Sequence, residues 1–418
     1  MERSMKKKVV GAAMVVAGLL CSCGQSQQGT SETEGAEFEH WNTNTDSVSE
    51  WKRVQKWEAY VEAHPKDEMG WRNLYDAKLY YSFWDNTTWN DSVREALMER
   101  ARKAIPDTYT YYYLAMETSY VSKERKVYAQ EAMKRLPKHP LKEDYVTWCR
   151  YLCREDGKEL KKMLKRYYES GLFPPDVLYY HYNELQGMEP GGIYLAEWED
   201  DLVPKLMIQL VFGMHRDKVL VNRNGDWGTI WQKCGVPYPD ENWAETTPMD
   251  EANPSVYFKT QTLKILDWIG AHSERPVYFS ARYLNMRWKS KLPKELLGNL
   301  YNEGLLMRYS SKPYDNIAVT CRNVEERYVL DYLYLPFSPT EDSKQVYSES
   351  SDLAYTTIVL LQGLLPHYQK ENPERCQWLS GLLLKATDRW KDVQIQERFA
   401  SLKSEIRPYH KATTPTEP

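Results

Sequence analysis

The sequence lacks the short motifs that mark the common enzyme and nucleic-acid-binding classes. It contains no Gly-x-Ser-x-Gly nucleophile motif, no phosphate-binding P-loop and no glycine-rich dinucleotide fingerprint. It also lacks His-x-x-x-His and Cys-x-x-Cys pairs, so we expect no zinc site and no cofactor. The formal net charge is −4 without a basic stripe, which argues against a nucleic-acid partner. These absences favour a non-enzymatic protein, although they do not exclude an enzyme.

Cysteines and long apolar runs are also scarce. Apart from two cysteines near the N-terminus, the chain has Cys149, Cys153, Cys234, Cys321 and Cys376. This odd number predicts no complete disulfide framework. Beyond the N-terminal region, no apolar run approaches the roughly 20 residues that a membrane-spanning helix needs. We therefore expect the body of the protein not to cross a membrane.

The N-terminus has the pattern of an export signal. Arg3 and Lys6 to Lys8 form a basic region, and Val9 to Leu20 is an apolar run that is too short for a membrane span. The following Leu20-Cys21-Ser22-Cys23 resembles the lipobox of bacterial lipoproteins. The resemblance implies removal of the signal peptide 1–22 and acylation of Cys23. Several acyl chains on one residue would then anchor the protein in a lipid bilayer.

A polar tether is expected at 23–46. Gly24 to Asn44 is rich in Gln, Ser, Thr, Gly and Glu and has almost no apolar residue, as flexible linkers do. No Asp follows Cys23 directly, which suits an outer-membrane destination. We therefore expect a lipid-anchored protein of the cell envelope, and both the periplasmic and the surface-exposed side remain open.

The next region, 47–187, has helical patterning. It is broken at Pro65, at Pro106, at 137–140 and at 174–175, and the intervals of roughly 30 to 40 residues are those of helix-pair repeats. The region resembles tetratricopeptide (TPR) repeats in degenerate form. This resemblance implies a concave surface that binds peptides or proteins, while a role as a spacer is an open alternative.

The region 188–320 has strand and helix patterning instead. An apolar strand at Ile193 to Ala196, an acidic turn, an apolar helix and a strand at Lys218 to Asn222 predict a parallel crossover unit. After an irregular loop, Gly225 to Pro254, the pattern continues with a helix and two strands, at Tyr257 to His272, Val277 to Ser280 and Glu303 to Tyr309. Helices are expected at 321–406 and a disordered tail at 407–418. The expected fold class is α plus α/β, with TPR-like helical repeats flanking a small, mostly parallel α/β domain.

The order of these strands resembles the soluble C-terminal part of a bacterial membrane family of unknown function related to protein O-mannosyltransferases. The matching positions fall in three short motifs: Glu197, Asp200 and Asp201; Arg275, Pro276, Tyr278 and Phe279; and Glu303, Gly304 and Leu305. The membrane-embedded catalytic half of such transferases has no counterpart in this sequence, so transferase activity does not carry over.

The acidic turn after the first strand contains the first candidate ligand-binding residues, Glu197, Glu199, Asp200 and Asp201. Ligands of parallel sheets bind at the carboxyl ends of the strands, where carboxylates can hold a divalent cation or a sugar hydroxyl. The favoured alternative is that Asp200 or Asp201 caps the following helix.

A second group of candidates lies in the irregular loop. Asp226 and Trp227 follow the second strand, and Asp226 paired with an acidic-turn residue would suit a glycosidase-like mechanism. Trp227, Trp231 and Trp243 would then be sugar-stacking platforms.

Two functions follow from these patterns. The first is a membrane-anchored lipoprotein that acts as a non-enzymatic protein-interaction or assembly module, with other envelope proteins as partners. The alternative is a glycan-binding or carbohydrate-active lipoprotein that uses the acidic sheet edge. The abundance of Tyr and Trp, 32 and 15 residues, suits helix packing and sugar stacking alike.

Overall fold

The computed structural model divides the chain into two compact units. The structure describes residues 35–39, 46–119, 122–154, 158–225, 227–239, 254–283, 293–335, 347–390 and 393–411. Unit 1 comprises Met1–Leu141 with Thr340–Val346, and unit 2 comprises Lys142–Pro339 with Tyr347–Pro418. The predicted signal peptide, Cys23, Asp226 and Trp243 lie outside the described residues. Each unit is described by itself.

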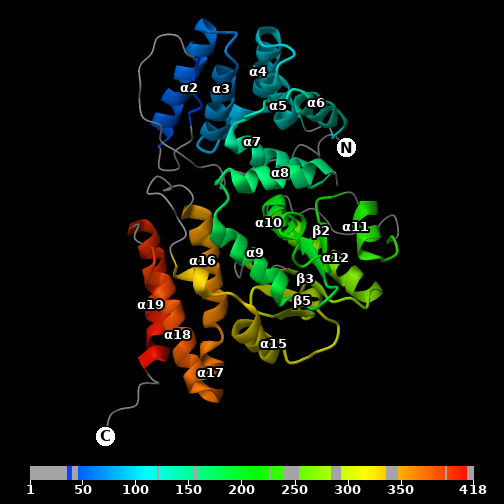
Figure 1. Cartoon of the computed structure of the whole chain (residues 1–418), viewed down its shortest axis with the longest axis vertical. Coiled ribbons are helices and arrows are strands. Elements are labelled where there is room, and N and C mark those ends of the chain that lie inside the picture. The colour runs from blue at the N-terminus through cyan, green and yellow to red at the C-terminus, as the bar shows by residue number, and fades with distance from the viewer. Residues whose placement is uncertain are drawn as a thin grey trace. The chain divides into compact units, whose positions relative to one another are not determined.

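The described part of unit 1 consists of helices, their connections and the extended residues 35–39 (Figure 1). The helices are α2 (Ser47–Ala63), α3 (Glu68–Tyr81), α4 (Asp91–Ala104), α5 (Tyr109–Thr118) and α6 (Ser122–Lys134). The predicted breaks at Pro65 and Pro106 are confirmed. Asp67 fixes the start of α3, because its carboxylate accepts a hydrogen bond of 2.9 Å from the backbone N–H of Met69.

Unit 2 begins with α7 (Lys142–Leu152), α8 (Lys158–Glu169) and α9 (Pro175–Gly187). These helices, which the sequence pattern groups with the repeats, therefore belong to the same unit as the sheet. The strands are β1 (Ile193–Ala196), β2 (Val219–Asn222), β3 (Val277–Ser280), β4 (Leu300–Asn302) and β5 (Leu306–Tyr309), in the order β2-β1-β3-β5-β4.

The sheet is mixed, so the prediction of a mostly parallel sheet is wrong for two of its strands. β1 pairs in parallel with β2 and β3, whereas β5 runs antiparallel to both β3 and β4. The reason is the short connection between β4 and β5. It turns at Gly304, whose φ of 93° suits glycine, and such a tight turn joins only antiparallel strands.

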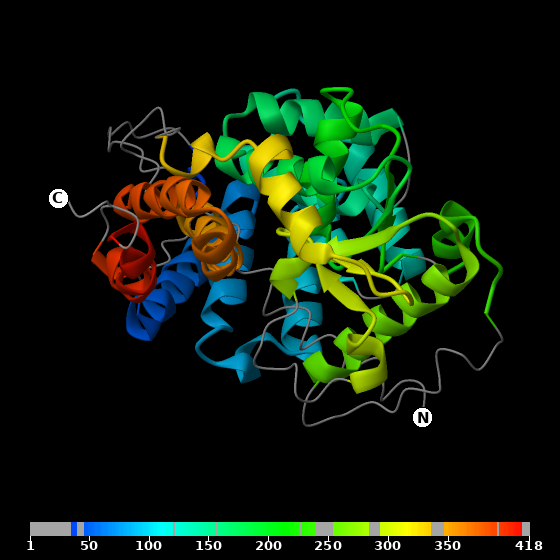
Figure 2. The same cartoon turned by 90° about the horizontal axis from the view of Figure 1, so that it is seen from below.

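One face of the sheet is covered by α11 (Trp227–Cys234) and α12 (Pro254–His272). Figure 2 shows α12 lying along the sheet. Side chains alternate along a strand, so this face receives every second residue. The core that forms here is apolar, and its strand residues are Ile193, Leu195, Val221, Val277, Phe279, Met307 and Tyr309.

Helix α11 corrects the prediction of an irregular loop from Gly225 to Pro254. Within the described part of that segment, Trp227–Cys234 forms a helix because Ile230, Trp231 and Cys234 pack into the core below the sheet. Trp231 is only 2% exposed, so it is a core residue and not the expected stacking platform.

The opposite face of the sheet meets α9 and α10 (Glu199–Leu210). It receives Tyr194, Tyr278, Ser280 and Arg308, the residues that alternate with the apolar set. Polar contacts therefore lie on this side beside buried apolar residues of α9 and α10 such as Leu185 and Met207, and the candidate site lies among these contacts.

The rest of unit 2 is largely helical, with α14 (Lys294–Leu297), α15 (Asn316–Arg322), α16 (Tyr347–Gln362), α17 (Leu365–Glu371), α18 (Pro373–Asp388) and α19 (Val393–Lys411). The expected disordered tail from Arg407 is wrong for its first residues, because α19 continues through Pro408 to Lys411. Ile406, just before this last turn, is fully buried and holds the end of α19 against the fold. Among the described helices, none is both long and apolar enough to cross a membrane.

Candidate functional site

The acidic turn after β1 does not present a single carboxylate cluster. Two of its side chains are held by arginines at the end of α7. Arg150 donates to the Oδ1 atom of Asp200 over 2.7 Å, and Arg154 donates to the Oε1 atom of Glu199 over 2.8 Å. Burial raises the pKa of Asp200, although Arg150 acts in the opposite direction. These two ion pairs therefore connect the first turn of α10 to the C-terminal end of α7.

The prediction that Asp200 or Asp201 caps α10 is wrong. Trp198 occupies the cap position and makes no side-chain capping hydrogen bond, while the acidic residues lie within the first turn. Bonds between an ionised carboxylate and a guanidinium are stronger than bonds to a neutral backbone N–H. Arg150 pairs with Asp200 and Lys205 pairs with Asp201, so neither carboxylate caps the helix.

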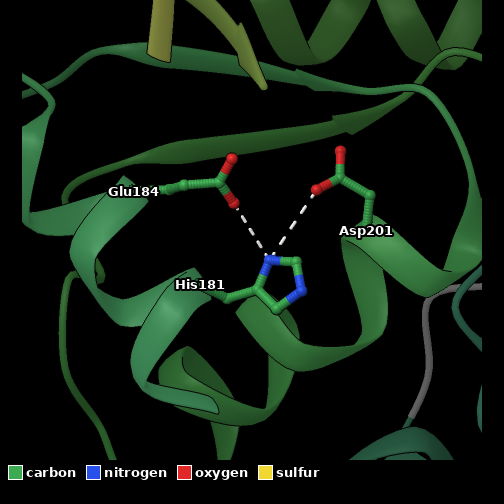
Figure 3. A group of neighbouring side chains, drawn as sticks. All are labelled: His181, Glu184 and Asp201. Atoms are coloured by element: carbon green, nitrogen blue, oxygen red, sulfur yellow. Dashed lines mark hydrogen bonds and ion pairs between the residues drawn. The ribbon is translucent and has the colours of Figure 1, made fainter. Parts of the chain in front are cut away.

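Asp201 turns inward and meets two residues of α9. Figure 3 shows His181, Glu184 and Asp201 converging, with the His181 ring between the two carboxylates. The Nδ1 atom of His181 lies 3.0 Å from the Oε2 atom of Glu184 and 3.8 Å from the Oδ1 atom of Asp201. Their candidate ligand atoms all lie within 4.8 Å of one another, a spacing that a metal ion can bridge.

The ammonium of Lys205 occupies the centre of this group. Its Nζ atom lies 2.6 Å from the Oε2 atom of Glu184, 2.6 Å from the Oδ1 atom of Asp201 and 2.8 Å from the Nδ1 atom of His181. An ammonium has three N–H donors, and the backbone carbonyl of Asp201, 3.2 Å away, is a further acceptor beside these side-chain atoms.

These four residues, which we call the buried quartet, are sealed from solvent. His181, Glu184, Asp201 and Lys205 are all 0% exposed. Burial, followed by the nearby Lys205 charge, holds the pKa of His181 well below its usual value, so the ring is neutral. The chain's own cation satisfies both carboxylates, and a metal ion would have to displace it. The quartet thus serves as a brace between α9 and α10.

Comparison with protein-family models, with curated proteins and with solved structures finds no match for this chain.

Tyr194 extends the brace to the sheet. Its hydroxyl donates to the carboxylate of Asp201 over 2.9 Å, and the ammonium of Lys205 lies 4.1 Å from the centroid of its ring. An ammonium above an aromatic face is electrostatically favourable, the more so when water is excluded. Residue 194 belongs to the middle strand of the parallel part of the sheet, so the quartet fixes both helices to that strand.

Glu197 is the acidic-turn residue that stays at the sheet edge. Its own backbone carbonyl accepts a hydrogen bond of 2.8 Å from Asn224, which follows β2. Its side-chain carboxylate accepts no hydrogen bond from any residue that the structure describes, although the residue is only 5% exposed. Burial raises the pKa of Glu197, while Lys259, Arg223 and Arg282 act to lower it.

The residues of the other resemblance motifs have local structural roles. Arg275 donates to the backbone carbonyl of Gly191 over 2.6 Å, which fixes the start of β1. The buried Glu303 accepts a hydrogen bond of 2.6 Å from the hydroxyl of Tyr314. Both contacts tie loops to the sheet.

The structure thus separates the residues that the sequence grouped together. Glu197 lies at the carboxyl edge, Glu199 and Asp200 pair with arginines, and Asp201 enters the buried quartet. Trp227 is the first residue of α11, and its side chain, like all of Asp226, lies outside the described residues.

Sequence reasoning missed His181, Glu184 and Lys205. Two spacings could have indicated them: His181 and Glu184 are three apart on α9, and Asp201 and Lys205 are four apart on α10. Each spacing places its two side chains on one face of a helix.

Proposed function

We propose that this chain is an envelope lipoprotein, anchored through acylated Cys23, that works as a non-enzymatic module for binding other envelope proteins. The observation that carries this proposal is an exposed aromatic patch in unit 1. Apolar patches on a folded surface are typical of protein interaction sites.

The aromatic patch is formed by Trp51 near the start of α2 and by Tyr81, Phe83 and Trp84 at the end of α3. The rings of Trp51 and Tyr81 are 5.0 Å apart between centroids, so the two helices contribute to one surface. Trp51, Phe83 and Trp84 are 44%, 43% and 55% exposed. Tryptophan and tyrosine are enriched at the energetic centres of protein interfaces, which supports a binding role.

The helix arrangement of unit 1 supports the same proposal. Its tightest packing is between neighbours in sequence, α2 with α3 and α5 with α6. Consecutive helix pairs of this kind make up TPR-type arrays, which bind peptides and proteins. We therefore propose that α2 to α6 form a short, degenerate TPR-like array.

The buried quartet also favours a binding role over catalysis. A catalytic acid, base or metal must reach the substrate, whereas all four quartet residues are sealed and neutralise one another. Within the described residues, the quartet supplies the only group of ligands with metal-binding spacing.

The test is co-purification from solubilised membranes under mild detergent. We expect the wild-type chain to retain a defined set of envelope proteins, and a Trp51→Ala/Trp84→Ala variant to lose it. Removing two interface tryptophans would cost about 2 kcal/mol or more each, which is enough to abolish a micromolar complex.

A matched control is Tyr238→Ala, which removes a 61% exposed aromatic ring from unit 2. This variant should retain the same proteins as the wild type, and all three chains should unfold at the same urea concentration. Equal recovery of the proteins by both variants, or equal loss by both, would refute the aromatic patch as the interaction site.

A second candidate function, glycan binding at the carboxyl edge of the sheet, is favoured by one observation. Glu197 combines a buried position with a carboxylate that makes no hydrogen bond to a described residue. The carbohydrate-active version of this candidate needs a second carboxylate, and Asp226 lies outside the described residues.

A further inference from the structure

We propose that unit 1 carries a binding surface for extended peptides in which an aromatic residue precedes a glutamate, and that the chain's own residues 35–39 occupy this surface until a partner peptide replaces them. The inference rests on the proposed function in one respect, because both take unit 1 as the part that binds other proteins. It deepens that function by naming a second surface, separate from the aromatic patch, and the chemistry of its ligand.

Residues 35–39 lie on unit 1 as a bound peptide would. They belong to the stretch whose composition predicts a flexible tether, yet these five residues contact α2 and α3 and form no helix or strand of their own. Ala36 and Phe38 are half-buried, whereas Gly35 and Glu37 are exposed. This alternation is that of an extended chain with one side against a surface.

Asn73 of α3 holds the main chain of the segment on both sides of Phe38. Its Nδ2 atom donates to the carbonyl of Glu37 over 2.8 Å, and its Oδ1 atom accepts from the N–H of Glu39 over 2.8 Å. The amide thus pairs with the segment as a neighbouring strand would, without contacting any side chain through these bonds. Asn73 is 0% exposed, and the segment satisfies both ends of its amide.

Two further side chains hold main-chain groups of the segment. The carboxylate of Asp67 accepts a hydrogen bond of 2.8 Å from the N–H of Ala36, and Arg53 donates to the carbonyl of Glu39 over 2.7 Å. Tyr60 donates to the same Asp67 oxygen over 2.7 Å, which keeps the carboxylate in place. Main-chain bonds of this kind are available to any extended peptide, so they provide affinity with little sequence preference.

The side chain of Glu39 supplies a preference for an acidic residue. Its Oε2 atom accepts hydrogen bonds from the Nε1 atom of Trp57 and, over 3.0 Å, from the ammonium of Lys56. The guanidinium of Arg53 adds a second positive charge, with its Nε atom 3.8 Å from the same oxygen. A carboxylate that meets two cations and an indole N–H is favoured over a neutral side chain at this position.

The side chain of Phe38 supplies a preference for an aromatic residue. The guanidinium carbon of Arg72 lies 5.8 Å from the centroid of the Phe38 ring. A cation near an aromatic face is attracted by it, which an aliphatic side chain cannot reproduce. Because Glu39 follows directly, the contacts select an aromatic residue and then a glutamate.

The chain's own segment uses this surface incompletely. The Nε atom of Arg53 is buried and donates no hydrogen bond to a described residue, because the Oε2 atom of Glu39, at 3.8 Å, is too far away. A partner peptide whose carboxylate comes closer to Arg53 would gain a charge-assisted hydrogen bond. The advantage of the chain's own segment is proximity, since the stretch 40–45 joins it to Asp46, and a short linker gives an effective concentration on the order of 1 mM.

The test is fluorescence anisotropy with a labelled synthetic peptide that has the sequence of residues 34–40, EGAEFEH. The receptor is the full-length chain with Phe38→Ala and Glu39→Ala, which weaken its own segment and leave α2 and α3 unchanged. This variant should bind the peptide about tenfold or more tightly than the wild type, because the wild-type segment competes at its high effective concentration.

A changed peptide tests the main-chain contacts without altering the protein. N-methylalanine at the position of Ala36 cannot donate to Asp67, so this peptide should bind the Phe38→Ala/Glu39→Ala variant about fivefold or more weakly. In the same background, Asn73→Leu removes both amide bonds and should weaken binding of the unmodified peptide about tenfold or more.

Two exposed lysines, one helical turn apart on α2, give a matched pair in the Phe38→Ala/Glu39→Ala background. Lys56→Ala removes a cation from the glutamate of the peptide and should weaken binding about two- to fivefold. Lys52→Ala removes a lysine that pairs with none of the residues 35–39 and should leave the dissociation constant unchanged. Equal effects of the two changes would contradict the assigned position of the glutamate.

Three results would overturn the proposal. One is equal binding of the peptide by the wild type and by the Phe38→Ala/Glu39→Ala variant, and another is equal binding of a scrambled peptide of the same composition. The third is a wild-type dimer, seen by analytical ultracentrifugation, that dissociates on the Phe38→Ala/Glu39→Ala change. The occupant would then be the segment of a second copy of this chain.

This experiment and the co-purification test fail separately. Trp51→Ala/Trp84→Ala leaves Arg53, Lys56 and Asn73 in place, so it should not weaken peptide binding in the Phe38→Ala/Glu39→Ala background. If envelope proteins co-purify through the aromatic patch while the peptide does not bind, the peptide surface is refuted and the proposed function stands.

Discussion

The two faces of the five-stranded sheet are stabilised by opposite kinds of chemistry. The face below α11 and α12 is a dry core in which Leu195 and Phe279 pack against apolar helix residues. The face below α9 and α10 contains the buried quartet, where one ammonium is shared by two carboxylates and a neutral imidazole. Neighbouring residues of a single strand, Tyr194 and Leu195, belong to these two environments.

This difference predicts how strongly substitutions on each face of the sheet should affect the stability of the fold. Apolar packing is non-directional and approximately proportional to buried area, so a similar side chain can replace another at small cost. Buried charges depend on each partner being present, because a lone charge in a low-dielectric interior is not compensated by water. Substitutions on the polar face should therefore lower the free energy of unfolding more than similar substitutions on the apolar face.

The largest effect should come from two matched substitutions to methionine. Lys205→Met keeps an unbranched side chain but leaves the carboxylates of Glu184 and Asp201 buried without their cation. We expect a loss of about 3–5 kcal/mol in the free energy of unfolding. Leu195→Met, on the dry face of the sheet, should cost about 1.5 kcal/mol at most.

Urea unfolding followed by circular dichroism measures both variants. Adding Glu184→Gln and Asp201→Asn to Lys205→Met should recover part of the lost stability, because the stranded charges are then removed. If Lys205→Met were no less stable than Leu195→Met, the contrast between the two faces would be wrong.

An intermediate effect should come from one added methyl group on the dry face. Gly270 of α12 lies against the ring of Tyr309 on β5, and a Cβ atom at this position would overlap that ring. The ring is also held by a hydrogen bond from the Tyr309 hydroxyl to Asp267, so it cannot easily move away. We expect Gly270→Ala to lower the free energy of unfolding by about 1–3 kcal/mol.

The same overlap predicts that a smaller side chain at position 309 should restore stability to Gly270→Ala. Tyr309→Leu in the Gly270→Ala background removes the ring and should return part of the lost stability. A double variant that is as unstable as the sum of the two single changes would show that the ring is not the obstacle.

The smallest effect should be a pH dependence confined to the charged face. Burial and Lys205 hold the pKa of His181 below the usual 6.5. Just below pH 6.5, His181 is therefore protonated in the unfolded chain and neutral in the folded chain. The stability contributed by the neutral ring is therefore fully present above pH 6.5 and is lost as the pH falls below it. The slope should approach roughly 1.4 kcal/mol per pH unit.

His181→Gln keeps an acceptor for Lys205 and removes this titration. The free energy of unfolding of the wild type should fall more steeply below pH 6.5 than that of the variant. Glu197 and Asp200, whose pKa values are raised, contribute in both proteins and cancel in the comparison. Parallel curves for the two proteins would contradict a neutral, buried His181.

The dry face was largely predictable from the sequence, and the polar face was not. β1 and β3 have the predicted bounds, because Ile193–Ala196 and Val277–Ser280 are short runs of mostly apolar and aromatic residues between turn residues. β4 was missed because Leu300–Asn302 is short and only half-buried, which leaves little pattern to detect.

The buried quartet escaped prediction for a different reason. Its members are residue types that usually face solvent, and burial of charge is visible only when two helices meet. The sequence did locate Glu197 and the acidic turn at the end of a parallel strand. The divergence of the four carboxylates depends on where Arg150, Arg154 and Lys205 lie in space, which no spacing along the chain encodes.

Lys205 gives the cluster of His181, Glu184 and Asp201 a counter-ion that cannot dissociate. A bound metal obeys mass action, so its occupancy falls with dilution, competition or a chelator. A covalently attached ammonium is present once in every molecule at any protein concentration. The folded core of unit 2 should therefore be indifferent to the supply of divalent cations, and the protein needs no loading step to complete it.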